Sequence, residues 1–122
     1  MGRRGSQRTE RVGQQVREML ASMLLFDVSD ERLRDVQIVG VDVASDLKYA
    51  DIYYIMIDQA DPTPDDNVRK ALANSAGYLR KMLGDRLTMK FVPELRFHYD
   101  ESIERGRRIE ALLDDVRADS EE

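Results

Sequence analysis

The fold is decided by one stretch of the sequence, Val68-Arg-Lys-Ala-Leu-Ala-Asn-Ser-Ala-Gly-Tyr-Leu-Arg-Lys-Met-Leu83. Its apolar and small residues recur at the spacing of one helical face: they are Val68, Ala71, Leu72, Ser75, Ala76, Leu79 and Leu83. Gly77 interrupts this helix at a cost of about 1 kcal/mol relative to alanine, and Asn74 and Ser75 compete with helical hydrogen bonds. We therefore predict a kink or break at residues 75–77 that gives two short helices. Thr63 as the cap and Pro64 at the first helical position mark where the first of them starts.

Two strands and a helix are predicted before this stretch. Val12, Val16, Leu20 and Leu24 belong to one apolar helical stripe, with Thr9 as its N-cap; residues 27–35 form a loop or a short helical turn. Residues 39–43 then alternate as a half-buried strand, and residues 45–48 supply a turn. The run 49–57 is β-branched and aromatic with two largely apolar faces, which predicts a central strand.

A third strand and a trailing helix follow. Alternating apolar residues from Phe91 to Tyr99 predict the strand, and Pro93, which lacks a donor for the ladder, places it at an edge or a bulge. Ser102 begins the trailing helix. The order is helix, strand, strand, helix, kink, helix, strand, helix, which is an α+β fold. We expect a single domain over residues 8–113, a flexible basic N-terminus over residues 1–7, and a flexible acidic tail over residues 114–122.

The composition excludes several classes of protein. The chain has no cysteine, which rules out disulfides, thiol nucleophiles and cysteine-based zinc sites. The longest apolar run, Ile52–Ile57, is far too short to span a membrane, and the N-terminus shows no secretory signal. We expect a cytoplasmic protein, a monomer, that requires no cofactor or metal.

Catalysis is not expected either. The only histidine, His98, alternates with Phe97 and Tyr99, so it points away from the core. Asp65 and Asp66 are explained by the positive end of a helix, and the chain has no phosphate-binding glycine loop. We predict that the protein is not an enzyme and has no small-molecule substrate.

The charge distribution suggests a nucleic-acid partner in spite of the net charge of −5. Only Asp85 and Glu94 oppose the basic residues of the segment 69–96, which are Arg69, Lys70, Arg80, Lys81, Arg86, Lys90 and Arg96. KH domains clamp single-stranded RNA with a GxxG loop between two helices, and here Ser75-Ala76-Gly77 stands in that place. A small-residue kink could expose a helix N-terminus to phosphate. An alternative explanation is that Gly77 allows the helix to pack closely on the sheet and that the charged residues are a solvated surface. The residues alone do not decide between this alternative and RNA binding.

At these residues the sequence resembles the ribosome-binding factor A family, over roughly residues 9–113. The most specific motif is Val92-Pro-Glu-Leu-Arg-Phe-His-Tyr-Asp-Glu-Ser-Ile-Glu-Arg-Gly-Arg-Arg-Ile109, and Asp46-Leu-Lys-Tyr-Ala50 and Ala71-Leu…Ser75-Ala-Gly-Tyr-Leu-Arg80 agree in order and spacing. Ser75 replaces the usual alanine of the kink, and Ala44 stands where a serine is expected.

The resemblance implies a type II KH-like domain: three strands, helices on one face, and a kinked helix pair in place of GxxG. It implies a factor that binds free or immature small (30S) ribosomal subunits and 16S rRNA, and that promotes rRNA maturation, especially in the cold. The family's kink maps to Ser75, Ala76 and Gly77. From charge alone we add Arg69, Lys70, Arg80, Lys81, Arg86, Lys90, Arg105, Arg107 and Arg108 as RNA-binding candidates. The alternative is a protein-interaction module that docks on a ribosomal protein or a GTPase through its acidic loop and tail.

Overall fold

The structure, a computed structural model, describes residues 7–57, 66–102 and 112–113. Its elements confirm the α+β class. In chain order they are α1 (Gln7–Phe26), the short 3-10 helix η1 (Glu31–Leu33), β1 (Val36–Val43), β2 (Tyr49–Met56), α2 (Asp66–Leu87) and β3 (Glu94–Tyr99). The predicted trailing helix, the N-terminal arm and the acidic tail lie largely outside the described residues.

The three strands form one sheet in the order β1-β2-β3. β1 and β2 are antiparallel neighbours, whereas β2 and β3 are parallel. The run of β-branched and aromatic residues is therefore the central strand, as predicted, and the strand that follows Pro93 lies at an edge. In the β1–β2 turn the N–H of Ala44 donates to the carbonyl of Tyr49, and the carboxylate of Asp46 accepts from the N–H of Lys48.

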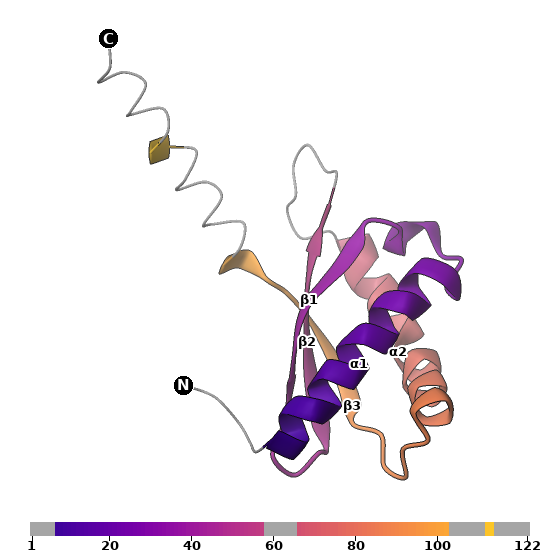
Figure 1. Cartoon of the computed structure of the whole chain (residues 1–122). Coiled ribbons are helices and arrows are strands. Elements are labelled where there is room, and N and C mark those ends of the chain that lie inside the picture. Colours follow the sequence, from indigo (N-terminus) through magenta and orange to yellow (C-terminus); the bar gives the residue numbers. More distant parts are fainter. Residues whose placement is uncertain (1–6, 58–65, 103–111, 114–122) are drawn as a thin grey trace.

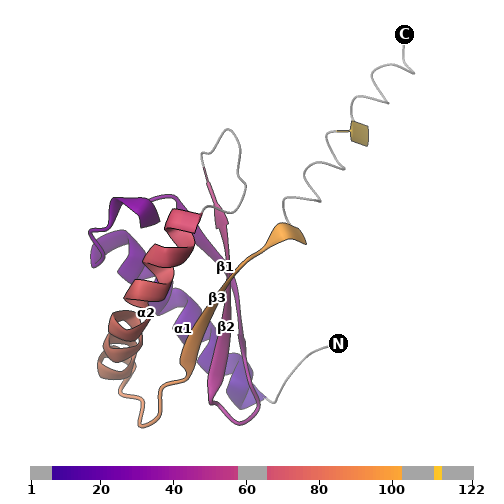
Figure 2. The ribbon, with the colours of Figure 1, turned by 180° about the vertical axis from the view of Figure 1, so that it is seen from behind.

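Both helices lie on the same face of the sheet, with α1 beside β1 and α2 beside β3 (Figures 1 and 2). The core forms between this face and the two helices. Most of its fully buried side chains come from α1, β2 and α2, and they include Leu20, Met23, Ile52, Tyr54, Leu72 and Leu79. Burying one such side chain contributes about 1.5–3 kcal/mol, so the packing of both helices on β2 is the main source of stability.

Three predicted boundaries are wrong. β3 begins at Glu94, so Phe91 and Pro93 precede the strand that they were predicted to belong to. α1 begins at Gln7, so Thr9 is a buried residue of the first turn instead of the cap. β1 begins at Val36, three residues before the predicted strand, because a bulge between Ile38 and Gly40 shifts the register. A bulge inserts an extra residue and so interrupts the two-residue alternation. The alternation read from Val39 onward therefore misses the first half of the strand.

The predicted pair of short helices is one element in the structure. α2 runs without a break through Ser75, Ala76 and Gly77. The ribbon changes direction about half-way along it, so the helix is bent rather than divided (Figures 1 and 2). Small residues such as Gly and Ser are a common site for a bend within a helix. The prediction of a bend near the middle of this segment agrees with the structure, but the predicted division into two helices is wrong. Both halves stay packed on the same sheet and remain one helix.

The end of α2 gives a first testable prediction. Thr88 follows the helix with φ +49°, and the N–H of Met89 donates to the carbonyl of Gly84 across it. This is the left-handed cap position that glycine favours, and a β-branched residue is strained there by about 1–2 kcal/mol. Thr88→Gly is expected to raise the free energy of unfolding by about 1 kcal/mol, measured by urea denaturation. An unchanged or lower midpoint would contradict the assigned cap.

Candidate nucleic-acid interface

The outward face of α2 is the main candidate site. Val68, Leu72, Leu79 and Leu83 bury the inward face against the core. On the opposite side, residues spaced by four, seven and eleven positions fall in line. We call these residues the outer stripe: Lys70, Asn74, Gly77 and Lys81, all exposed.

The outer stripe combines positively charged side chains with a glycine that another backbone can approach closely. Within the described part of the chain, Lys70 and Lys81 make no hydrogen bond and no ion pair, so both ammonium groups are available to a partner. Between them, a Cβ added to Gly77 would meet no atom within 4 Å. The surface beside Gly77 is therefore open, and another backbone could approach it more closely than it could approach any side chain.

Arg80 does not belong to this free surface. Its Nε and Nη2 donate to the carbonyl oxygen of Val92, at 3.2 and 2.9 Å. The guanidinium thereby ties α2 to the segment that leads into β3. Gly84, one turn further along, supports the same contact, because a Cβ there would lie 2.8 Å from a methyl group of Val92. Arg80 thus has a structural role that charge counting did not reveal.

Arg86 is likewise bound within the protein. Its Nη1 lies 2.8 Å from the carboxylate of Asp27, just after the end of α1. The hydrogen bond and the charge of Arg86 lower the pKa of Asp27 below its usual value, and the same bond raises the pKa of Arg86. The pair links the ends of the two helices. It leaves Arg86 less free than Lys70 or Lys81 to meet an external anion.

The other candidates are dispersed. Arg69 is exposed, 3.9 Å from Asp66 on the preceding turn. Lys90 lies beyond the end of α2, with its Nζ 5.7 Å from the ring centroid of Phe91. Ser75 and Ala76 are half-buried on the flank of the helix. Arg105, Arg107 and Arg108 lie outside the described residues. The structure thus brings together Lys70, Gly77 and Lys81 from the predicted set and adds Asn74, which helical spacing from Lys70 could have identified.

A second polar cluster was not foreseen. Asp51, on the face of β2 opposite the helices, is 6% exposed. Its Oδ1 lies 3.1 Å from Nε of Arg96 and 2.8 Å from Nε2 of His98, both on β3. The guanidinium of Arg96 also lies over the ring of Tyr49, 4.3 Å from its centroid. His98 does point away from the core, as predicted, but it holds β3 to β2 through Asp51.

This second cluster is better suited to stability than to chemistry. Its two basic side chains converge on one carboxylate, which neutralises charge and joins neighbouring strands. Among residues 7–57, 66–102 and 112–113, no three histidine, aspartate or glutamate side chains gather as they would around a metal ion. None of the described helices is long and apolar enough to cross a membrane. The outer stripe of α2 remains the surface best arranged to meet an anionic chain.

Comparison with known proteins decides the family. The sequence model of ribosome-binding factor A matches residues 8–113. The chain belongs to this family. A ribosome-binding factor A from Chromohalobacter salexigens is 41% identical over 112 residues, which cover 92% of this chain and 86% of the relative.

Solved structures agree on the fold. The crystal structure of ribosome-binding factor A from Thermus thermophilus superposes with a TM-score of 0.64 at 20% identity, covering 75% of this chain and 94% of that one. A homology model of the Thermus thermophilus factor, fitted into a cryo-electron-microscopy map of a 30S–ribosome-binding factor A complex, gives a TM-score of 0.60 at 20% identity, with 73% and 91% covered. These likenesses confirm the architecture that the family resemblance implies.

Proposed function

We propose that this member of the ribosome-binding factor A family binds free or immature 30S subunits in the cytoplasm through 16S rRNA, as a monomer, and favours maturation of that rRNA, above all in the cold. The observation that carries the proposal is the outer stripe of α2, where two unpaired lysines flank a glycine with open space beside it. The Thermus thermophilus relative, whose fold is the same, has been fitted into a 30S complex.

The mode of recognition follows from the residues of the stripe. Lysine is a point charge that meets phosphate without reading the base, so the contacts would position the protein on a backbone of suitable shape. Asn74 can donate to and accept from the same backbone. Binding one rRNA arrangement more tightly than another shifts the equilibrium toward the bound form by that difference in affinity. No reacting group is required for such a role.

Sedimentation of a lysate that contains the tagged full chain tests the proposal. We expect the protein to travel with free 30S subunits and to be absent from translating ribosomes. With purified 30S subunits, the logarithm of the affinity should fall with the logarithm of salt concentration, with a slope of about 0.7–0.9 for each phosphate neutralised. Binding that ignores salt, or equal presence on translating ribosomes, would contradict the proposal.

Gly77→Ala is expected to separate stability from binding. Gly77 lies within a continuous helix and has room for a methyl group, so alanine should raise the free energy of unfolding by up to about 1 kcal/mol. The same methyl group would stand at the centre of the outer stripe and weaken 30S binding severalfold. Thermal unfolding and a 30S binding titration measure the two effects. A loss of stability would show that the bend depends on glycine, and unchanged binding would remove Gly77 from the interface.

A further inference from the structure

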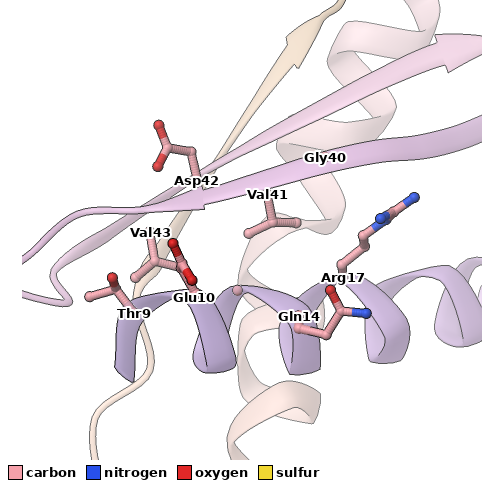
Figure 3. A pocket seen from close by; sticks show the side chains of 9 residues that line it. Thr9, Glu10, Gln14, Arg17, Gly40, Val41, Asp42 and Val43 are labelled. Atoms are coloured by element: carbon pink, nitrogen blue, oxygen red, sulfur yellow. The ribbon is translucent and has the colours of Figure 1, made fainter. Parts of the chain in front are cut away.

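A groove follows the outer edge of the sheet between α1 and β1. It consists of two neighbouring hollows of about 360 and 400 Å³ that share Gln14 and Arg17 of α1. The first hollow borders residues 40–43 of β1 and the second borders residues 36–38. Figure 3 shows the first, with Arg17 extending from α1 toward the strand. The groove therefore runs along nearly the whole length of β1, at the edge of the sheet opposite β3 and the outer stripe.

The strand beside the groove is able to pair with another strand. β1 is an edge strand, and its bonds at Asp35 and Ala44 go to the neighbouring strand β2. In an antiparallel ladder the direction of the peptide groups alternates. The N–H and C=O groups of Val36 and Val43 and the N–H of Val41 are therefore directed to the outer edge, whereas the carbonyl oxygen of Val41 lies against Gly13 of α1, where an added Cβ would be 3.4 Å from it. Such a row of donors and acceptors matches the backbone of an added strand.

The floor of the second hollow is apolar. Ala21, Leu24 and Leu25 line it from α1, and Val36 and Ile38 line it from β1. Leu25 is 73% exposed, and Phe26 beside it is 80% exposed. Apolar side chains at alternate positions of an added strand would point toward this floor. Covering it would bury surface that is now in contact with water.

Two arginines beside the groove indicate where the bound segment would carry acidic residues. Arg17 lies where the two hollows meet, and Arg34 lies at the far end of the second hollow. Within the described residues neither guanidinium has a hydrogen bond or an ion pair. Guanidinium groups pair well with carboxylates. An acidic residue on each side of an apolar run would meet one of them.

The same surroundings disfavour an RNA chain. Glu10 lines the first hollow and Glu18 lines the second, so a continuous polyanion would meet a carboxylate in each, whereas the carboxylate of Asp42 points away from α1 (Figure 3). A peptide with only two acidic residues can place them at Arg17 and Arg34 and avoid the others. The apolar floor also offers phosphate no partner.

We propose that this groove binds an extended segment of a partner protein, which adds to β1 as a fourth strand, with apolar side chains at alternate positions and a carboxylate at each end of the apolar run. The site is separate from the outer stripe and does not depend on the proposed RNA binding. It gives the domain a second surface, through which it can hold a protein while α2 meets RNA.

The test is a titration of the ¹⁵N-labelled full chain with one defined peptide, followed by NMR. The probe is a capped ten-residue peptide that alternates valine and threonine and has two aspartates about five residues apart, because about 3.3 Å per residue then matches the half of β1 between Arg34 and Arg17. We expect shifts concentrated in β1 and α1, and slower hydrogen exchange at the amides of Val36, Val41 and Val43. The same peptide with lysine in place of both aspartates should bind at least about tenfold more weakly, a difference of about 1.4 kcal/mol.

Protein variants locate the site. Arg17→Glu with Arg34→Glu should weaken peptide binding by at least about tenfold. Ala21→Lys, which places a charge on the apolar floor at an exposed position of α1, should do the same. Lys70→Glu with Lys81→Glu, on the other helix, should bind the peptide as the wild type does.

Three outcomes would overturn the proposal. They are shifts centred outside β1 and α1, unchanged affinity in both groove variants, and no saturable binding of the peptide. A twelve-nucleotide single-stranded RNA that produced the stronger shifts at the same amides would assign the groove to nucleic acid and would also overturn it. Because the outer stripe is intact in the groove variants, their binding to 30S subunits reports separately on the proposed RNA-binding function.

Discussion

Replacing Lys70 and Lys81 together by glutamate is expected to weaken binding to purified 30S subunits by about a hundredfold. Each change removes an available ammonium group from the outer stripe and places a carboxylate against phosphate, and a loss of about 1.4 kcal/mol at each position gives a factor of ten. Both side chains are exposed and make no bond within the described residues. The free energy of unfolding should therefore stay within about 0.5 kcal/mol of the wild type. Filter binding at fixed salt and urea denaturation measure the two quantities.

A control variant with the same change in net charge distinguishes the effect of local contacts on binding from the effect of the overall charge. Arg11→Glu with Lys48→Glu changes the net charge by the same amount at exposed positions of α1 and of the β1–β2 turn. We expect this variant to lose much less affinity than the α2 variant. Equal losses in both variants, or no loss in either, would show that the outer stripe is not the RNA interface. Arg80 is unsuitable for such a test, because its bond to Val92 makes any change at that position a change of stability as well.

Asp51→Ala is expected to lower the free energy of unfolding by about 2–3 kcal/mol at pH 7. The carboxylate is almost fully buried and accepts from Arg96 and His98 across the β2–β3 pair. Alanine would leave both basic side chains without this acceptor. The loss stays below that of a fully buried pair, because Arg96 and His98 are about half exposed and can be hydrated. Urea denaturation of the two proteins gives the difference directly.

The same contribution should depend on pH. Burial raises the pKa of Asp51, but the hydrogen bond with His98 and the charge and hydrogen bond of Arg96 outweigh burial, so its pKa lies below the usual 3.8. A carboxyl group with a depressed folded-state pKa stabilises the fold fully above its unfolded pKa, and this stabilisation disappears as the pH falls through the folded-state value. The difference between wild type and Asp51→Ala should thus be retained just above pH 3.8 and shrink below it.

The exposed Asp85 supplies the control for this prediction. Asp85 lies on α2 and makes no bond among the described residues. Asp85→Ala should stay within about 0.5 kcal/mol of the wild type over the whole pH range. If Asp51→Ala also left the free energy of unfolding unchanged at pH 7, the Asp51 cluster would have no role in holding β3 to β2.

Much of the fold was predictable because its signals are local. The β-branched run after the turn identified β2 as the central strand, since both of its faces are apolar. The strand after Pro93 does lie at an edge, although Pro93 itself precedes β3 and so removes no donor from its ladder. The apolar stripes identified both helices. The first half of β1 was missed, because the bulge between Ile38 and Gly40 shifts its alternation, and Gly40 within the strand is the local signal that could have indicated it.

The candidate site was predictable only in part. The spacing of Lys70, Gly77 and Lys81 along a helix was sufficient to place them on one face. Charge counting could not separate these free lysines from Arg80 and Arg86, because the groups that bind those arginines come from other segments. Val92 is 12 residues away from Arg80 in sequence, and Asp27 is 59 residues away from Arg86.

The sequence by itself determined the order of elements, the central strand, the inward and outward faces of both helices, and the family. Each of these depends on residues close together in the chain or on a motif read as a whole. Only the tertiary structure decided that α2 bends without breaking, which arginines are bound within the protein, and that a groove accompanies β1. These features depend on contacts between distant segments, and such contacts exist only once the sheet and the two helices have packed together.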